Sequence, residues 1–267
     1  MRDERHRTRV LSADDLEVIA GRTLQHYEDN AEYFWEGTKD HDVEQNIQAL
    51  LDSIAGAPPY RILDLGCGPG RDLIRLTALG HAPVGLDGAI AFVNMAREKS
   101  RCEVWHQDFL ALDLPDDHFD GVFANAALFH VPRQELGRVL RELSDSLKPD
   151  GVLFSSNPRG NNREGWSGER YGCYHDLEEW RRHGEEAGFE EVRYYYRPSG
   201  KPRDQQPWIA TVWRKIVRTT PADTPTPLSG RAHAQASWGA STEPASRPTS
   251  QGRTHAMGCR ETGVKFD

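Results

Sequence analysis

The chain has 267 residues, of which 41 are acidic and 33 basic, and its formal net charge is −8. This balance argues against a nucleic-acid partner, which needs clustered Lys and Arg, and no stretch approaches the roughly 20 apolar residues of a membrane span. The four cysteines, Cys67, Cys102, Cys173 and Cys259, lie far apart without the spacing of a zinc site, so we expect reduced thiols, a cytoplasmic location and no metal.

The N-terminal segment, residues 1–56, is predicted to form a helical and aromatic cap. Ser12 and Asp15 resemble a capping box, with Asp in place of Glu or Gln, and open a helix that runs to about Asn30. An aromatic, glycine-broken stretch, 33–42, follows this helix. A second helix then places its apolar residues on one face: Val43, Ile47, Leu50, Leu51 and Ile54. Because these segments precede the first core strand, we expect them at the edge or mouth of the sheet, either as a lid or as a structural brace.

From Tyr60 onward, apolar strands alternate with amphipathic helices. The predicted strands are 62–65, 82–86, 102–105, 119–124 and 152–156, and the predicted helices between them are 72–79, 89–99 and 133–147. Such alternation is typical of a parallel sheet covered by helices on both faces, which is a doubly wound α/β fold. A turn at 148–151 separates the last of these helices from the fifth strand, since Pro149 cannot continue a helix.

Beyond the fifth strand, the chain enters a loop rich in Gly and Asn, 157–172. The loop follows the carboxyl end of a strand, which is where ligands bind in open α/β sheets. We then predict helix 177–187 and two strands, 189–197 and 208–213, that pair as a C-terminal β-hairpin at the edge of the sheet. These elements complete a domain at 57–218. Residues 219–267, which are rich in Pro, Thr, Ser, Ala and Gly, are predicted to be a disordered tail.

The first predicted strand runs into the sequence Asp64-Leu-Gly-Cys-Gly-Pro-Gly70, and a helix follows. A strand, a glycine turn and a helix open many nucleotide-binding units, although a tight structural turn is the plain alternative. Asp87 ends the second strand, about 20 residues further on, where an acid can accept hydrogen bonds from both ribose hydroxyls. Arg71 stands where a dinucleotide-binding turn has its third glycine, so a ligand with adenosine but no pyrophosphate fits better.

This stretch resembles the class I S-adenosylmethionine-dependent methyltransferase family. Residues 64–70 match its first motif, Asp87 matches its ribose acid, and Asp108 with Phe109 matches its adenine motif, although Asp108 could also be a solvated surface acid. The resemblance implies a seven-stranded Rossmann-like methyltransferase sheet, with S-adenosylmethionine as the methyl donor and no metal. Asn125, after the fourth strand, could hydrogen-bond the amino acid end of the cofactor. The candidate cofactor-binding residues are Asp64, Gly66, Gly68, Gly70, Asp87, Asp108, Phe109 and Asn125.

Methyl transfer is an in-line displacement with a neutral leaving group, so the protein must supply alignment, dry surroundings and sometimes a base. The candidate bases are His130, after the fourth strand, and His41, in the aromatic cap; His130 could equally be a hydrogen-bonded packing residue. The candidate substrate-binding residues are Tyr33, Trp35, Arg159, Arg170 and Tyr174. These arginines could bind a carboxylate and these rings could enclose a flat ligand, while exposed arginines and a plain aromatic lid core are the alternatives.

Five segments carry a closer resemblance, to the methyltransferase domain of ovothiol biosynthesis: 34–43, 102–109, 155–160, 170–177 and 203–208. This resemblance implies methyl transfer to a ring nitrogen of 5-thiohistidine, a small-molecule acceptor. In that family the domain follows an iron-dependent sulfoxide synthase, so we expect functional coupling to a separate synthase. Two alternatives stay open: a methyltransferase of the same fold acting on another small amine, acid or thiol, and a non-catalytic partner subunit that binds S-adenosylmethionine.

Overall fold

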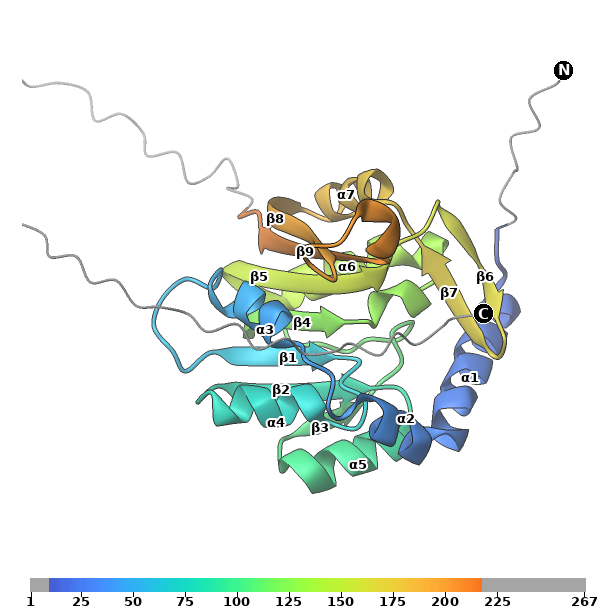
Figure 1. Cartoon of the computed structure of the whole chain (residues 1–267), viewed down its shortest axis with the longest axis horizontal. Coiled ribbons are helices and arrows are strands. Elements are labelled where there is room, and N and C mark those ends of the chain that lie inside the picture. Colours follow the sequence, from blue (N-terminus) through green and yellow to red (C-terminus); the bar gives the residue numbers. More distant parts are fainter. Residues whose placement is uncertain (1–9, 218–267) are drawn as a thin grey trace, which may run out of the picture. The chain divides into compact units, whose positions relative to one another are not determined.

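The computed structural model describes residues 10–217, and the predicted tail at 219–267 lies outside these residues. A seven-stranded sheet runs through the centre of the described chain, with helices on both of its faces (Figure 1). Its strands lie in the order β3-β2-β1-β4-β5-β9-β8. Their bounds are β1 Arg61–Leu65, β2 Ala82–Asp87, β3 Val104–His106, β4 Phe119–Asn125, β5 Leu147–Pro158, β8 Phe189–Arg197 and β9 Trp208–Lys215. The predicted doubly wound fold and its C-terminal hairpin are confirmed.

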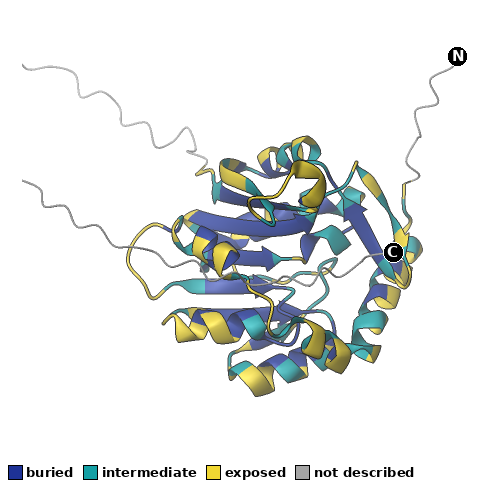
Figure 2. Cartoon of the chain, in the orientation of Figure 1, coloured by how far each residue is buried: buried dark blue, intermediate teal, exposed yellow. Residues whose placement is uncertain are grey.

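The parallel strands β1 to β5 form because their apolar runs bury both faces of the sheet, as Figure 2 shows along the strand ribbons. On one face, Leu63 and Leu65 join a core cluster with α6 (Arg133–Ser146) and α7 (Leu177–Glu186). On the other face, Ile62 joins a cluster with α3 (Glu44–Leu51). The helices α4 (Arg71–Ala78) and α5 (Ile90–Ser100) follow β1 and β2 and pack around Val93. Strand β9 runs antiparallel to both β5 and β8, which closes this edge of the sheet.

The N-terminal segment divides into a brace and a lid. Helix α3 packs its predicted apolar face, including Ile47 and Leu50, directly on the sheet. Helix α1 (Ala13–Asp29) begins at the predicted capping box, in which Ser12 and Asp15 bond each other's backbone N–H groups. Helix α1 then contacts α5 and β7 (Arg170–Tyr174), and the short helix α2 (Ala31–Thr38) follows it. Helix α3 therefore fits the reading as a brace, while a lid formed by α1 and α2 stays a prediction; we call α1 and α2 the lid helices.

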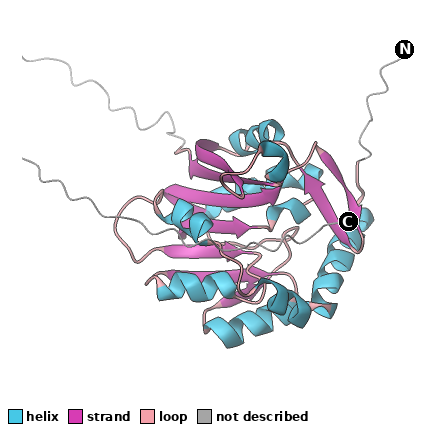
Figure 3. Cartoon of the chain, viewed as in Figure 1, coloured by secondary structure: helices cyan, strands magenta, loops and turns pink. Residues whose placement is uncertain are grey.

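Two stretches have more regular structure than we predicted. The stretch 157–172, expected to be a loop, contains β6 (Arg163–Ser167), which pairs antiparallel with β7 in a separate two-stranded sheet (Figure 3). The expected turn at 148–151 falls within the bounds of the long strand β5, but the pairing with β4 shifts register between Leu147 and Val152, and Asp150 there has a left-handed φ of +62°. The sequence did not predict the pairing of β6 with β7, because Gly165 and Gly172 lie opposite each other in the register. Neither residue has a side chain, so the alternation of apolar and polar residues that marks a strand is absent there. None of the helices within residues 10–217 is both long and apolar enough to cross a bilayer.

Candidate active site

The turn after β1 brings three glycines into close contact with other elements. Gly66, Gly68 and Gly70 all have left-handed backbone conformations, with φ of +70°, +52° and +93°. A Cβ on Gly66 would lie 2.7 Å from the Cβ of Ala127, and one on Gly70 would lie 2.9 Å from the Cα of Ala96. Any side chain at these two positions would therefore clash as well as strain the backbone. The turn leaves its backbone open to close approach by a ligand.

The carboxylate of Asp87 lies beside this turn, at the carboxyl end of β2. It accepts hydrogen bonds of 2.9 Å from the N–H groups of Gly68 and Ala89. Burial raises the pKa of Asp87 to about 6, although the backbone hydrogen bonds act in the opposite direction. Each carboxylate oxygen keeps a further lone pair, so the group can also accept bonds from two hydroxyls. This arrangement fits the ribose of an adenosine cofactor.

Asp64 is buried next to the turn, and burial raises the pKa of its carboxyl well above the ordinary range. Its Oδ2 has no hydrogen-bond partner within the described part of the chain. A buried, unsatisfied oxygen is costly unless a ligand or water meets it. The unsatisfied oxygen of Asp64 is thus a second observation that fits a polar ligand at the glycine turn. The neighbouring Asp72 is already paired with Arg71 at 2.7 Å.

The predicted adenine residues lie after β3. The ring of Phe109 packs against the glycine turn, with its Cζ 3.1 Å from the position that a Cβ on Gly66 would take. Asp108 accepts a 2.9 Å hydrogen bond from the N–H of Leu110 and so shapes the turn that carries the ring. Phe109 therefore reaches the turn, while the carboxylate of Asp108 stabilises the local backbone.

Asn125 lies at the end of β4 and is held by a polar network. Its Oδ1 accepts a 2.9 Å bond from Nδ2 of Asn46, which is fully buried on α3. The Oδ1 of Asn46 in turn accepts a 2.9 Å bond from the hydroxyl of Tyr195. The amide group of Asn125 is thereby oriented, and its Nδ2 remains a donor that this chain of bonds does not use.

The lid helices cover the glycine turn with aromatic side chains. Phe34 lies 3.7 Å from the position of a Cβ on Gly68, and its ring packs against those of Tyr27 and Phe92 at centroid distances of 5.7 and 5.1 Å. The carboxylate of Glu28 accepts bonds from the N–H groups of Ile90 and Ala91, at the N-terminus of α5. Unpaired amides at a helix N-terminus attract such a negative group. The lid is therefore fastened to α5 both by apolar packing and by charge.

His130 lies under the lid, in a short 3₁₀ turn at Leu128–His130. Its Nδ1 donates to the carbonyl of Tyr171 at 2.7 Å, so its Nε2 accepts from the hydroxyl of Tyr27 at 2.8 Å. Burial lowers the pKa of His130 to about 4, which keeps the imidazole neutral. Arg170 lies beside Tyr27 and His130 and acts on the pKa of both through its charge. Tyr174 completes this group, 6.1 Å from Phe129 between ring centroids.

The structure does not bring every predicted substrate residue to this place. Tyr33 points into solvent, whereas Trp35 is partly buried and has Lys99 over its ring at 4.7 Å. His41 is exposed in the turn after α2. Arg159 donates a 2.8 Å bond to the carbonyl of Arg203, beyond the end of β5. Of the residues predicted for catalysis or substrate, His130, Arg170 and Tyr174 are therefore the ones that gather below the lid.

Sequence reasoning missed the inward-facing lid residues. Tyr27 and Phe34 are seven residues apart, with Leu24 and Ala31 at the same helical spacing. This apolar stripe is detectable in the sequence, but our prediction used the neighbouring aromatic residues instead: Tyr33, which is exposed, and Trp35, which is partly buried. The contact of Phe92 on α5 with these two rings could not be predicted from the sequence, because it depends on how α5 packs against the lid helices.

Comparison with known proteins agrees with this geometry. Residues 62–151 match the family described as "Methyltransferase domain". The 27-O-demethylrifamycin SV methyltransferase of Amycolatopsis mediterranei is 28% identical over 214 residues, which cover 70% of this chain and 75% of that protein. The 24-methylenesterol C-methyltransferase 2 of Oryza sativa subsp. japonica is 34% identical over 128 residues, which cover 45% of this chain but only 33% of the rice protein.

A solved structure shares the fold at lower sequence identity. It is the 1,6-didemethyltoxoflavin-N1-methyltransferase of Burkholderia thailandensis, with bound 1,6-didemethyltoxoflavin and S-adenosylhomocysteine. The likeness has a TM-score of 0.62 and 20% identity, and it covers 78% of this chain and 93% of that one. At this identity the likeness concerns the fold.

Proposed function

We propose that this chain, a class I S-adenosylmethionine-dependent methyltransferase, transfers a methyl group to a small-molecule acceptor. The observation that carries this proposal is the carboxylate of Asp87, held by the N–H groups of Gly68 and Ala89 directly beside the glycine turn. The lid favours a small acceptor, because Tyr27 and Phe34 pack over the turn and leave little room for a macromolecular chain.

S-adenosylmethionine supplies an electrophilic methyl group on a sulfonium. The chain's own residues bind and orient the cofactor: Asp87 accepts the ribose hydroxyls, and the glycine turn permits close approach of its backbone. The lid excludes water from the reacting groups, and a fixed geometry lowers the entropic part of the barrier. His130 is neutral and carries its proton on Nδ1. Once the hydrogen bond from the hydroxyl of Tyr27 to Nε2 is broken, Nε2 can take a proton from the methyl acceptor.

For the acceptor itself we propose 5-thiohistidine, methylated on a ring nitrogen. Three features support this choice besides the resemblance of segments such as 170–177 to the ovothiol-related domain. Arg170 is a cation that can bind a carboxylate, Tyr174 and Phe129 offer aromatic surface, and His130 offers a proton acceptor. Phe129 and His130 follow the carboxyl end of β4, while Arg170 and Tyr174 are the first and last residues of β7.

The test is to incubate the purified chain with S-adenosylmethionine and a panel of acceptors and to weigh the products. The panel contains 5-thiohistidine, histidine and representative small amines, carboxylic acids and thiols. We expect a methylated product from 5-thiohistidine and at least tenfold slower transfer to histidine, which lacks the sulfur that fills the site. Rapid transfer to another acceptor would overturn the choice of thiohistidine alone. Cofactor binding without turnover on any acceptor would favour a non-catalytic binding subunit.

A further inference from the structure

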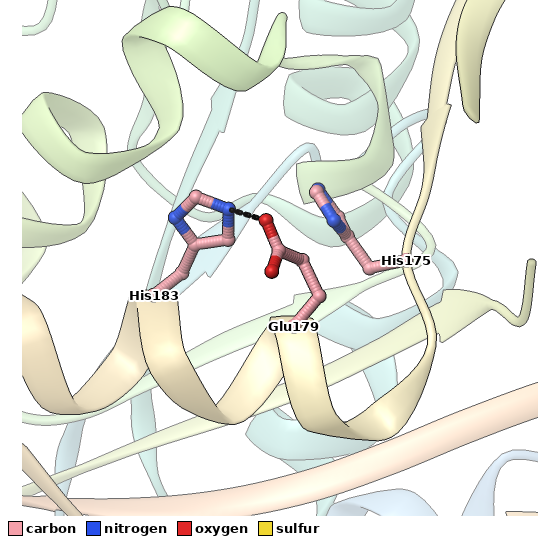
Figure 4. A group of neighbouring side chains, drawn as sticks. All are labelled: His175, Glu179 and His183. Carbon is pink, nitrogen blue, oxygen red and sulfur yellow. Dashed lines mark ion pairs between the residues drawn. The ribbon is translucent and has the colours of Figure 1, made fainter. Parts of the chain in front are cut away.

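Three side chains remote from the glycine turn converge on one face of α7. His175, Glu179 and His183 recur at every fourth residue, and each offers a ligand atom, all within 4.8 Å of one another. Figure 4 shows the carboxylate of Glu179 lying between the two imidazole rings. Our expectation of no metal rested on cysteine spacing and on sequence motifs, and it overlooked this histidine–glutamate–histidine repeat.

Both imidazoles carry a buried nitrogen that the protein leaves unsatisfied. His175 and His183 are 5% and 7% exposed, and within residues 10–217 neither Nδ1 of His175 nor Nε2 of His183 has a hydrogen-bond partner. The Nε2 of His183 approaches Oε1 of Glu179 only to 3.5 Å. Two unsatisfied nitrogens side by side are costly in a folded protein and indicate a missing ligand.

The surroundings orient His175 for coordination. Its Nε2 lies 3.1 Å from Sγ of Cys173, and when the ring proton is directed at this sulfur, the lone pair of Nδ1 points away from it. Metal-bound histidines commonly donate their second N–H to a neighbouring acceptor in this way. Cys173 thus has the position of a supporting residue, next to a ligand and not itself part of the histidine–glutamate–histidine group.

The carboxylate of Glu179 forms ion pairs with arginines, and one of these pairs would have to break for Glu179 to bind a cation. Arg182 contacts it at 2.6 Å and Arg133 at 3.7 Å. Arg182 also pairs with Glu186 at 2.8 Å and is about half exposed, so it can keep one carboxylate partner while Glu179 turns toward a cation. The release of this surface ion pair costs little, since such pairs contribute about 0–1 kcal/mol.

We propose that His175, Glu179 and His183 bind one first-row divalent cation of the Zn²⁺ class. Two imidazole nitrogens and one carboxylate oxygen suit such ions better than Mg²⁺ or Ca²⁺, which prefer oxygen ligands. Bond lengths of about 2.0–2.2 Å require a modest contraction of the three ligand atoms around the ion. His175 directly follows β7, so the ion would tie α7 to the end of the strand that carries Arg170 and Tyr174. It would therefore stabilise the wall of the proposed acceptor site without entering the transfer step.

The test uses the full chain, freed of metal with a chelator, and titration calorimetry with Zn²⁺ at neutral pH. We expect one ion per chain, and His175→Gln, Glu179→Gln and His183→Gln should each weaken binding by more than about 100-fold, because loss of a ligand exceeds the ~10- to 100-fold effect of a supporting residue. Cys173→Ala should fall within that smaller range. His118→Gln, at a partly exposed site directly before β4 and outside the histidine–glutamate–histidine group, is the matched control and should bind as the parent chain does.

A second readout guards against misfolded variants. Co²⁺ bound to the parent chain should give visible absorption bands of low-symmetry coordination, and these should be missing from the three ligand variants while their circular dichroism stays native. Other residues, including His233, His255 and Cys259, could also bind metal. Binding that persists unchanged in all three variants would place the ion there and overturn the proposal, as would a parent chain that binds no Zn²⁺.

Discussion

The buried carboxylate of Asp87 makes the stability of the chain depend on pH. Burial raises its pKa to about 6, whereas an unfolded aspartate titrates near 3.9. Between about pH 4 and 6 the folded chain therefore holds a proton that the unfolded chain has lost, and stability from this group falls as the pH rises through that window. If Asp87 binds the ribose, as we propose, the hydroxyls donate to the ionised carboxylate, and binding then improves at the pH where the stability from this group declines.

We predict that Asp87→Asn weakens cofactor binding. Gly68 and Ala89 donate to different oxygens of the carboxylate, so the single amide oxygen of asparagine can accept from only one of them, and this loss opposes the gain in stability from removing a buried charge. Affinity for S-adenosylmethionine should fall by about 10- to 100-fold, which corresponds to the loss of a charge-assisted hydrogen bond. Calorimetric titrations from pH 5 to 8 should show weaker binding below about pH 6 in the parent chain and a flat profile in the variant. An unchanged affinity at pH 8 would remove Asp87 from the cofactor site.

A second prediction at this scale compares two arginines. Arg170 lies beside Tyr27 and His130 below the lid, whereas Arg159 is engaged with the carbonyl of Arg203. If Arg170 binds the acceptor's carboxylate, Arg170→Ala should raise KM about tenfold and change kcat much less, because a distant anchor contributes uniform binding. Arg159→Ala should have the smaller effect on KM. Steady-state kinetics at varied acceptor concentration measure KM and kcat of both variants. A larger rise in KM for Arg159→Ala than for Arg170→Ala would instead place the carboxylate-binding residue at the end of β5.

At the scale of elements, the sequence predicted the helices and strands whose apolar residues recur at a regular local spacing. The alternation of apolar strands and amphipathic helices yielded the positions of the parallel strands along the chain, and Ser12 with Asp15 marked the start of α1. The ladder of β6 and β7 was missed, because two facing glycines give no alternation. The glycine turn and Asp87 were found because the motif is local. The bond between Tyr27 and His130 joins residues 103 positions apart, so only the packed fold can bring them together.

The division of the N-terminal segment into brace and lid predicts two different mutant phenotypes. Leu50 on α3 is fully buried and fills the space above Gly121, where a Cβ would meet its side chain at 3.1 Å. Leu50→Ala should lower the free energy of unfolding by about 2–5 kcal/mol, the usual cost of such a cavity. Its cofactor affinity, measured well below the melting temperature, should stay close to that of the parent chain.

Phe34 on α2 is only half buried, so Phe34→Ala should change stability less than Leu50→Ala does. Because its ring packs over Gly68, its removal should loosen the closed lid and speed both association and dissociation of the cofactor. Stopped-flow fluorescence, with the chain's tryptophans as reporters, gives both rate constants. Rates that match the parent chain would show that α2 does not gate the site.

At the scale of the whole molecule, the described residues 10–217 contain the entire sheet, its core clusters and the candidate site. Residues 218–267 offer few large apolar side chains: Leu228, Trp238, Met257, Val264 and Phe266. From this composition we predicted a tail that buries too little apolar surface to offset the entropy of ordering it, and this prediction lies outside the described residues. Core stability and chemistry should therefore reside in the first 217 residues.

We accordingly predict that a chain ending at residue 217 keeps the melting temperature, the cofactor affinity and the turnover of the full chain. For a domain of about 200 residues, each 1 kcal/mol corresponds to roughly 2–4 °C, so calorimetric scans resolve even a small contribution. A chain ending at residue 207 is the matched comparison: it removes only ten more residues but deletes β9, which pairs with both β5 and β8 and carries the fully buried Trp213. This second chain should not fold, because the loss of β9 leaves β8 without a partner and exposes the edge of β5. A melting temperature several degrees lower in the 217-residue chain would instead mean that residues 218–267 pack on the domain.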